Sequence, residues 1–270
     1  MTPILTIIFF IFGIIIGSFL NVVIFRLNTQ KTFGGRSICL SCQHQLSWYE
    51  LIPLFSFVFL RGRCKNCKTK ISIQYPIVEF TVGLIFALLF VKFQDVFFLD
   101  VFIFSLTYAY YALMFSLLVV IAVYDIRHKI IPDILSVIFG ILAFIGLFFF
   151  SAGGGSAFGG NAGFNLHLPT LFGFLSGLII AAPFALLWLV SRGSWMGLGD
   201  AKLAIGLGWL FGIYSALSGI VIAFWIGAIV GIILVIFSKK YGMKSEIPLA
   251  PYLVLGTLLV FLFNLSLFGI

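Results

Sequence analysis

The apolar residues of this sequence lie in long continuous runs that are separated by short polar segments. The first run covers 4–25, contains no charged residue and is long enough to cross the roughly 30 Å hydrocarbon core of a bilayer. Later apolar runs cover 76–91, 101–124, 130–150, 171–190 and 249–268. The stretch 201–237 has room for two short helices that turn between Gly212 and Gly219. The pattern predicts an all-α polytopic membrane protein with about eight transmembrane helices.

The composition supports the same fold class. Of the 270 residues, 62% are hydrophobic and only 9% are charged, and the mean hydropathy is +1.23. Soluble domains are roughly half apolar and about one quarter charged, so a soluble protein is excluded. Eight crossings of about 20 residues each leave too little chain for a separate soluble catalytic domain of ordinary size. Any catalytic chemistry is therefore expected in the membrane or at its surface.

The basic residues indicate how the helices are oriented. Lys and Arg number 16 against 8 Asp and Glu. Fifteen of the 16 fall in four clusters, at 26–70, 127–129, 192–202 and 239–244. With the N-terminus outside and eight spans, all four clusters lie on the cytoplasmic side, and Lys92 is the one basic residue on the outer side. The Gly-rich loop 151–168 is also an outer loop in this topology. No basic face with stacking aromatic residues is evident, which argues against a nucleic-acid partner.

All four cysteines fall in the polar segment 26–75, in two CxxC pairs formed by Cys39, Cys42, Cys64 and Cys67. The two pairs suit one tetrahedral metal site, because each tight turn directs two thiolates toward the same ion. We expect zinc, or iron at the same site, in a small cytoplasmic loop domain that depends on the metal for folding. Redox pairs and disulfides are the alternatives, which a reducing cytoplasm disfavours. The apolar stretch 48–54 predicts that this domain lies against the membrane surface.

Asp125 and Asp200 each lie where an apolar span meets the cytoplasmic edge of the membrane. A carboxylate in that position is costly unless it has a function or a partner. If the two helices pack together, one acid of the pair holds a proton while the other activates water, as in aspartic peptidases. The structural alternative is that Asp200 caps the helix that follows it and that Asp125 pairs with a nearby cation, Arg127 or Lys129.

The residues around the two aspartates add to this interpretation. Gly197 and Gly199 precede Asp200 and permit close backbone approach at the start of a membrane helix, and Lys202 follows in the same motif. After Asp125, the sequence Ile131-Pro132-Asp133 predicts a new helix, because proline favours the first helical turn and Asp133 can cap it.

The remaining acids are expected to have simpler roles. Asp95 and Asp100 are predicted in a short outer turn, where they cap helices, and Glu50 is predicted to be solvated. Glu79 differs, because it lies within the second apolar span, where a carboxylate is costly. It either supports function or pairs with a cation, Lys202 or Arg127.

Together these motifs resemble the bacterial type IV prepilin peptidases, membrane aspartic peptidases that also process type II secretion pseudopilins. The resemblance rests on Gly17–Val23 with Arg26, Arg36-Ser37 before the first cysteine pair, 46–53, 61–64, 75–79, the Asp125 motif, 197–203 and 247–251. It implies a bacterial inner-membrane enzyme that cleaves the basic leader of prepilins after a glycine, on the cytoplasmic side. In many members the resemblance also implies N-methylation of the new N-terminus with S-adenosylmethionine.

Under this resemblance, Asp125 and Asp200 match the two catalytic aspartates, and the four cysteines match the cysteine tetrad of the family. The implied partners are prepilins, pseudopilins and the lipid bilayer. Two features depart from the family pattern, namely the Gly-rich insert 151–163 and Leu249-Ala250 in place of Phe-Gly before Pro251. No phosphate-cradling glycine loop after a strand is recognisable, so the methyltransferase activity rests on the resemblance alone.

Two other interpretations stay open at the level of the sequence. An intramembrane protease of the presenilin or signal-peptide-peptidase kind shares the GxGD motif, and Tyr124-Asp125 matches its Tyr-Asp motif, but such proteases lack the double CxxC segment. A small proton-coupled transporter would use Asp125 and Asp200 as a relay and the zinc loop as a docking module. Transporters of that type usually contain inverted repeats, and none is visible in this sequence. The oligomeric state is not specified by the sequence.

Overall fold

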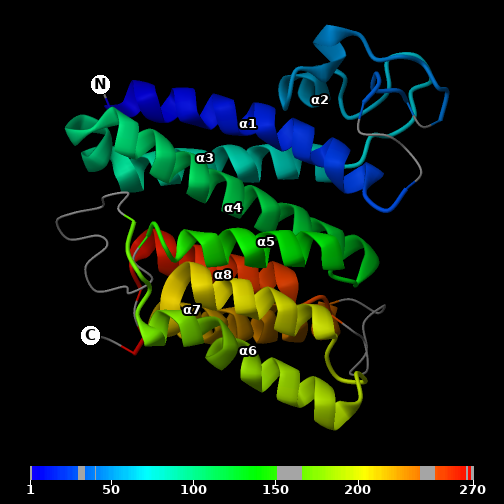
Figure 1. Cartoon of the computed structure of the whole chain (residues 1–270). Coiled ribbons are helices and arrows are strands. Elements are labelled where there is room, and N and C mark those ends of the chain that lie inside the picture. Colours follow the sequence, from blue (N-terminus) through cyan, green and yellow to red (C-terminus); the bar gives the residue numbers. More distant parts are fainter. Residues whose placement is uncertain are drawn as a thin grey trace. The chain divides into compact units, whose positions relative to one another are not determined.

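A computed structural model describes residues 2–29, 34–39, 41–150, 166–237, 247–265 and 267–268. These residues form helices and connecting segments, and the only β-pairing among them is two isolated bridges, Ile38 with Gln45 and Arg63 with Lys70. The elements, shown in Figure 1, are α1 (Thr2–Arg26), η1 (Trp48–Leu51), α2 (Phe55–Phe59), α3 (Gln74–Leu99), α4 (Val101–His128), α5 (Asp133–Gly146), α6 (Leu171–Ser191), α7 (Leu198–Phe237) and α8 (Ala250–Phe263). The all-α prediction is confirmed.

Five of the described helices are long and apolar enough to cross a membrane, namely α1, α3, α4, α6 and α7. The apolar helices α5 and α8 are shorter, with 14 residues each. Helix α7 has 40 residues, and its backbone leaves the helical conformation at Gly212, with φ 75° and ψ 174°. Only glycine adopts such angles without strain. The break falls in the interval where the sequence predicted two short helices, while the total of about eight spans stays a prediction.

The chain divides into two compact units, Met1–Asp95 and Val96–Ile270, and each is described by itself. In the first unit, α1 and α3 pack closely at glycines. A Cβ atom added to Gly13 would lie 2.8 Å from the Cα of Gly83, and one added to Gly17 would lie 2.8 Å from the Cα of Glu79. Such contacts between small residues let helix backbones approach in a membrane, where burial of apolar surface does not drive association.

The second unit is a bundle of α4 to α8 in which α7 is central. Its first half packs against α6, where a Cβ atom on Gly208 would lie 2.7 Å from the Cα of Gly177. Its second half packs against α8, where a Cβ atom on Gly219 would lie 2.9 Å from the Cα of Thr257. Helix α8 also packs on α4, with the rings of Tyr111 and Phe261 4.8 Å apart. This packing sets the position of the start of α7.

The structure corrects the predictions for Asp95 and Glu50. Asp95 lies inside α3 and not in a turn. Glu50 is buried, with 7% of its surface exposed, and accepts a hydrogen bond from the backbone N–H of Ser47 at 2.8 Å, so the prediction that it is solvated is wrong. Asp100 caps α4 as predicted, because its Oδ1 accepts hydrogen bonds from two backbone N–H groups of the first turn. The Gly-rich insert 151–163 lies outside the described residues.

Candidate active site and metal centre

Asp125 lies near the C-terminal end of α4 and is buried, with 4% of its surface exposed. Its Oδ2 accepts a hydrogen bond from the backbone N–H of Ala250 at 3.1 Å, in the first turn of α8. Pro251 follows and has no N–H, so Ala250 provides the donor at this point of the turn. The N-terminal end of a helix carries positive partial charge, which suits a carboxylate. The N-terminus of α8 therefore holds Asp125 in place.

Asp200 lies in the first turn of α7 and is half-buried. The two glycines before it have different surroundings. A Cβ atom on Gly199 would lie 2.8 Å from the Cβ of Ile131, whereas the nearest atom to one on Gly197 would be the Oδ2 of Asp200, at an ordinary 3.7 Å. Gly199 is thus the residue that lets the start of α7 lie directly against the segment before α5.

The carboxyl groups of Asp125 and Asp200 lie close enough to interact electrostatically. They come from different helices, and both are shielded from solvent to a large extent. Two acids that share such a site do not readily ionise together. In such a pair, the protonated acid can donate a proton to a substrate, and the carboxylate can accept one from water.

A second contact joins the same segments at the surface. The Nζ of Lys202 lies 2.6 Å from the Oδ1 of Asp133, the first residue of α5. The N-cap of α5 is Pro132, so the prediction that Asp133 caps this helix is wrong. Its charge pairs with α7 instead, two residues beyond Asp200.

Glu79 belongs to the first unit, where it is buried in α3. Its Oε2 accepts a hydrogen bond from the backbone N–H of Leu54 at 2.8 Å. Leu54 has a φ of 60°, unusual for a residue with a side chain, and it directly precedes α2. Glu79 therefore connects a membrane helix to the cysteine-containing segment. Its predicted pairing with Lys202 or Arg127 would join the two units and stays a prediction.

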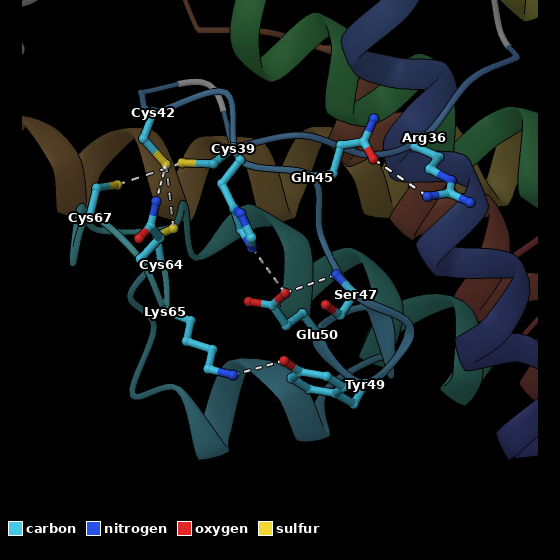
Figure 2. A network of polar contacts seen from close by, with 12 residues as sticks. Arg36, Cys39, Cys42, Gln45, Ser47, Tyr49, Glu50, Cys64, Lys65 and Cys67 are labelled. Carbon is cyan, nitrogen blue, oxygen red and sulfur yellow. Dashed lines mark hydrogen bonds and ion pairs between the residues drawn. The ribbon is translucent and has the colours of Figure 1, made fainter.

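The four cysteines converge as predicted. Their Sγ atoms all lie within 4.8 Å of one another, with 3.8 Å between Cys39 and Cys67 and 4.0 Å between Cys42 and Cys64 (Figure 2). Zinc bonded tetrahedrally to sulfur at about 2.3 Å would place the sulfur atoms roughly 3.8 Å apart. The spacing therefore fits a tetrahedral ion such as zinc.

The backbone of each CxxC pair follows the same course. The N–H of Cys39 donates to the carbonyl of His44, and the N–H of Cys64 donates to that of Thr69, both at 2.9 Å. The residue after each second cysteine has a positive φ, 55° at Gln43 and 59° at Lys68. Two matching turns thus present two thiols each to one point.

Two of the four thiols have a lowered pKa, which favours the thiolate form. A hydrogen bond from the backbone N–H of Cys42 lowers the pKa of Cys39, and a hydrogen bond with the Thr69 hydroxyl lowers the pKa of Cys67 to about 6. The thiolate is the form that binds a metal, so one thiol in each turn is poised for coordination.

Comparison with known proteins identifies the family. The family model "Bacterial Peptidase A24 N-terminal domain" matches residues 11–93, and the model "Type IV leader peptidase family" matches residues 112–232. The chain is 35% identical to a "Prepilin leader peptidase/N-methyltransferase" from Myxococcus xanthus. The matched region covers 90% of this chain and 67% of the relative. It is also 30% identical to a Bacillus subtilis protein with the same name, and this match covers 96% of this chain and 95% of the relative.

The chain belongs to the type IV leader peptidase family. A relative from Vibrio cholerae, also named prepilin leader peptidase/N-methyltransferase, is 30% identical over 94% of this chain. No solved structure matches the chain. Membership of the leader peptidase family favours a peptidase over a transporter, and it makes this chain an enzyme of the bilayer.

In this leader peptidase, the sequence pattern did not predict that the backbone N–H of Ala250 binds Asp125. The segment 247–251 stood out only as part of the family pattern, and no role followed from it. The available signal was Pro251, which marks a helix start whose neighbouring N–H can bind an acid. Which acid it binds depends on the packing of α8 against α4.

The metal centre leads to a direct prediction of metal content. The purified leader peptidase should contain about one equivalent of zinc or iron, and Cys64→Ser should lose most of it, because three thiolates hold the ion far less tightly. Ser41→Ala is the matched control, since Ser41 lies between the first two cysteines and provides no thiol. Elemental analysis of both variants checks this. Metal content below half an equivalent in the native protein would contradict the tetrathiolate site.

A smaller effect is expected for the ion pair of Asp133 and Lys202. Both side chains are partly exposed, so removing the pair should lower the free energy of unfolding by only about 0.2–1 kcal/mol. Asp133→Asn, Lys202→Gln and the double variant, compared by thermal unfolding in detergent, measure the coupling. If the two single changes add fully in the double variant, the pair contributes nothing to stability.

Proposed function

We propose that this chain is a membrane aspartic endopeptidase that removes the basic leader peptide of type IV prepilins and type II pseudopilins after a glycine. The proposal is supported by the position of Asp125 and Asp200 in one unit, at the ends of two apolar helices, where their charges interact. The names of the relatives supply the substrate class. The carboxylate pair supplies chemistry suited to peptide hydrolysis.

In the proposed reaction, one aspartate takes a proton from a water molecule while the water oxygen attacks the carbonyl carbon of the leader glycine. The other aspartate donates its proton to the carbonyl oxygen, which gives a neutral tetrahedral diol. The newly protonated aspartate then gives its proton to the departing amine nitrogen as the C–N bond breaks. The other aspartate takes a proton from one diol hydroxyl, so that the new carboxyl group forms and the pair again holds one proton. The Oδ2 of Asp125 is engaged by Ala250, which leaves Oδ1 to contact the water.

The proposed site faces the cytoplasm. Arg127 and Lys129 follow Asp125 within four residues, and Lys202 follows Asp200 within two. Basic residues beside membrane spans favour the cytoplasmic side, so this arrangement supports a bacterial inner-membrane enzyme that cuts its substrate from that side. The proposed organisation is a first helix at 1–25, a four-cysteine metal domain at 26–75 and a peptidase domain at 76–270. A basic leader would be attracted by the acids, Asp125, Asp133, Asp200 and Glu79.

We also propose that the new N-terminus is methylated with S-adenosylmethionine as methyl donor. This rests on the word N-methyltransferase in the names of the relatives. No described residue is assigned to the binding of this cofactor.

The proposal is tested with the purified protein in nanodiscs and a synthetic prepilin peptide that contains its basic leader. Mass spectrometry should find a single cut after the leader glycine, followed by one added methyl group when S-adenosylmethionine is present. Cleavage at another bond would contradict the assigned specificity. Cleavage without methylation would contradict only the second activity.

A further inference from the structure

The segment between α1 and α3 contains a pocket beside the cysteine cluster. Its volume is about 570 Å³, and it is lined by the apolar residues Phe59 and Leu60 together with four cations, Arg61, Arg63, Lys65 and Lys68. Cys64, one of the four thiols, contributes to the same wall. The pocket thus combines a strongly positive lining with an apolar edge.

The positive charge of this lining is only partly neutralised within its segment, because a zinc ion held by four thiolates would add a net charge of about −2 against the eight cations. Between residues 26 and 75 there are eight Lys and Arg and one acid, Glu50. Glu50 is buried and holds the Ser47 N–H, with His44 Nε2 3.7 Å from the same oxygen (Figure 2). In the part of the chain that the structure describes, none of the four lining cations forms an ion pair with a carboxylate. A cluster of this kind attracts an anion.

Apolar side chains lie exposed next to the pocket. On α2, Phe55, Val58 and Phe59 stand at positions i, i+3 and i+4, on one face of the helix, and Val58 and Phe59 are 72% and 81% exposed. On η1, Trp48 is 77% exposed. We call these four residues the apolar ridge. Trp beside Phe and Val, flanked by cations, is the composition of a surface that enters the interface of a bilayer.

The pocket and the ridge are parts of one surface. Phe59 belongs to both, and the Nζ of Lys65 donates a hydrogen bond to the Tyr49 hydroxyl at 2.8 Å, next to Trp48 (Figure 2). The segment is tethered at both ends to candidate membrane spans, α1 and α3. Its ridge is therefore held within reach of the lipid headgroups.

We propose that this pocket binds the phosphate headgroup of an anionic phospholipid while the apolar ridge inserts among the neighbouring lipids. The four cations provide donors and charge for the phosphate, and Phe59 and Leu60 face the glycerol and acyl region. A free phosphate compound shares the charge but has no use for the ridge. The proposal does not depend on the peptidase activity, and it can be tested in an Asp125→Asn background.

The test uses a variant in which Trp48 is the single tryptophan, with Trp188, Trp195, Trp209 and Trp225 changed to Phe. It is placed in nanodiscs of phosphatidylcholine with increasing phosphatidylglycerol. Quenching of Trp48 by acrylamide should fall, and quenching by brominated acyl chains should rise, as phosphatidylglycerol increases. Inorganic phosphate added to nanodiscs of phosphatidylcholine alone should have no such effect.

Charge-matched double variants locate the effect in the pocket. Arg61→Gln with Lys68→Gln removes one Arg and one Lys that line it, and Arg36→Gln with Lys70→Gln removes the same charges from the same segment outside it. The phosphatidylglycerol content at half-maximal protection should rise roughly fivefold or more for the pocket pair, and by less than about twofold for the control pair. Unchanged metal content in both variants shows that the segment remains folded.

Four results would overturn the proposal. Equal shifts for the two pairs would mean a diffuse surface charge, and full protection of Trp48 in phosphatidylcholine alone would mean insertion without headgroup recognition. The same response to inorganic phosphate would make the pocket a site for soluble phosphate compounds. Protection by a prepilin peptide, with no effect of phosphatidylglycerol, would make the ridge a surface for substrate.

Discussion

Replacing either Asp125 or Asp200 with Asn is expected to slow cleavage of a prepilin peptide by about 10²- to 10⁴-fold. Asparagine keeps the size of the side chain and can still accept the hydrogen bond from Ala250, but it cannot exchange a proton with water or with the substrate. The fold should therefore survive while the chemistry is lost. Single-turnover cleavage, followed by mass spectrometry, measures the rate.

Asp100→Asn is the matched control for both variants. Asp100 belongs to the same unit and caps α4, and asparagine caps a helix about as well as aspartate. Its cleavage rate should stay close to that of the wild type. Suppose that Asp125→Asn or Asp200→Asn had the same unfolding temperature as the wild type and still cleaved at half the wild-type rate. The paired-aspartate mechanism would then be wrong.

The second large effect is expected from Gly199→Ala. The added Cβ would lie 2.8 Å from the Cβ of Ile131, closer than real Cβ contacts permit, and neither atom is the flexible end of a side chain. The start of α7 must then move away from the segment before α5 and carry Asp200 with it. A displacement of about 1 Å in a catalytic group costs roughly 100-fold in rate, so cleavage should fall by about that factor.

Gly197→Ala provides the control for this steric argument. It adds the same methyl group two residues earlier, where the nearest contact is an ordinary 3.7 Å to the Oδ2 of Asp200. Cleavage should remain within a few-fold of the native rate, and both variants should bind metal as the wild type does. Similar losses for the two glycines would show that contact with Ile131 does not position Asp200.

Several features of this protein follow from the sequence alone. The excess of apolar residues determines a helical membrane protein, because only helices satisfy their backbone hydrogen bonds within one apolar segment. The two CxxC pairs are local motifs, so their spacing predicts the shared site that the Sγ distances confirm. The break at Gly212 was predictable for a similar reason, because an apolar stretch of 37 residues exceeds one crossing and glycine permits the turn. Scarcity of charge singled out Asp125 and Asp200.

Tertiary structure decided which partner each polar group has. Whether Glu50 is solvated or buried depends on how the surrounding segment folds over it, although the apolar residues on both sides of it were compatible with burial. Asp133 was expected to cap α5 because capping is a local interaction, but packing brings Lys202 from a distant helix within 2.6 Å. Asp125 receives the Ala250 N–H because α8 packs along α4. The pairings of Asp133 and Asp125 join residues far apart in the chain, and short-range sequence patterns carry no information about them.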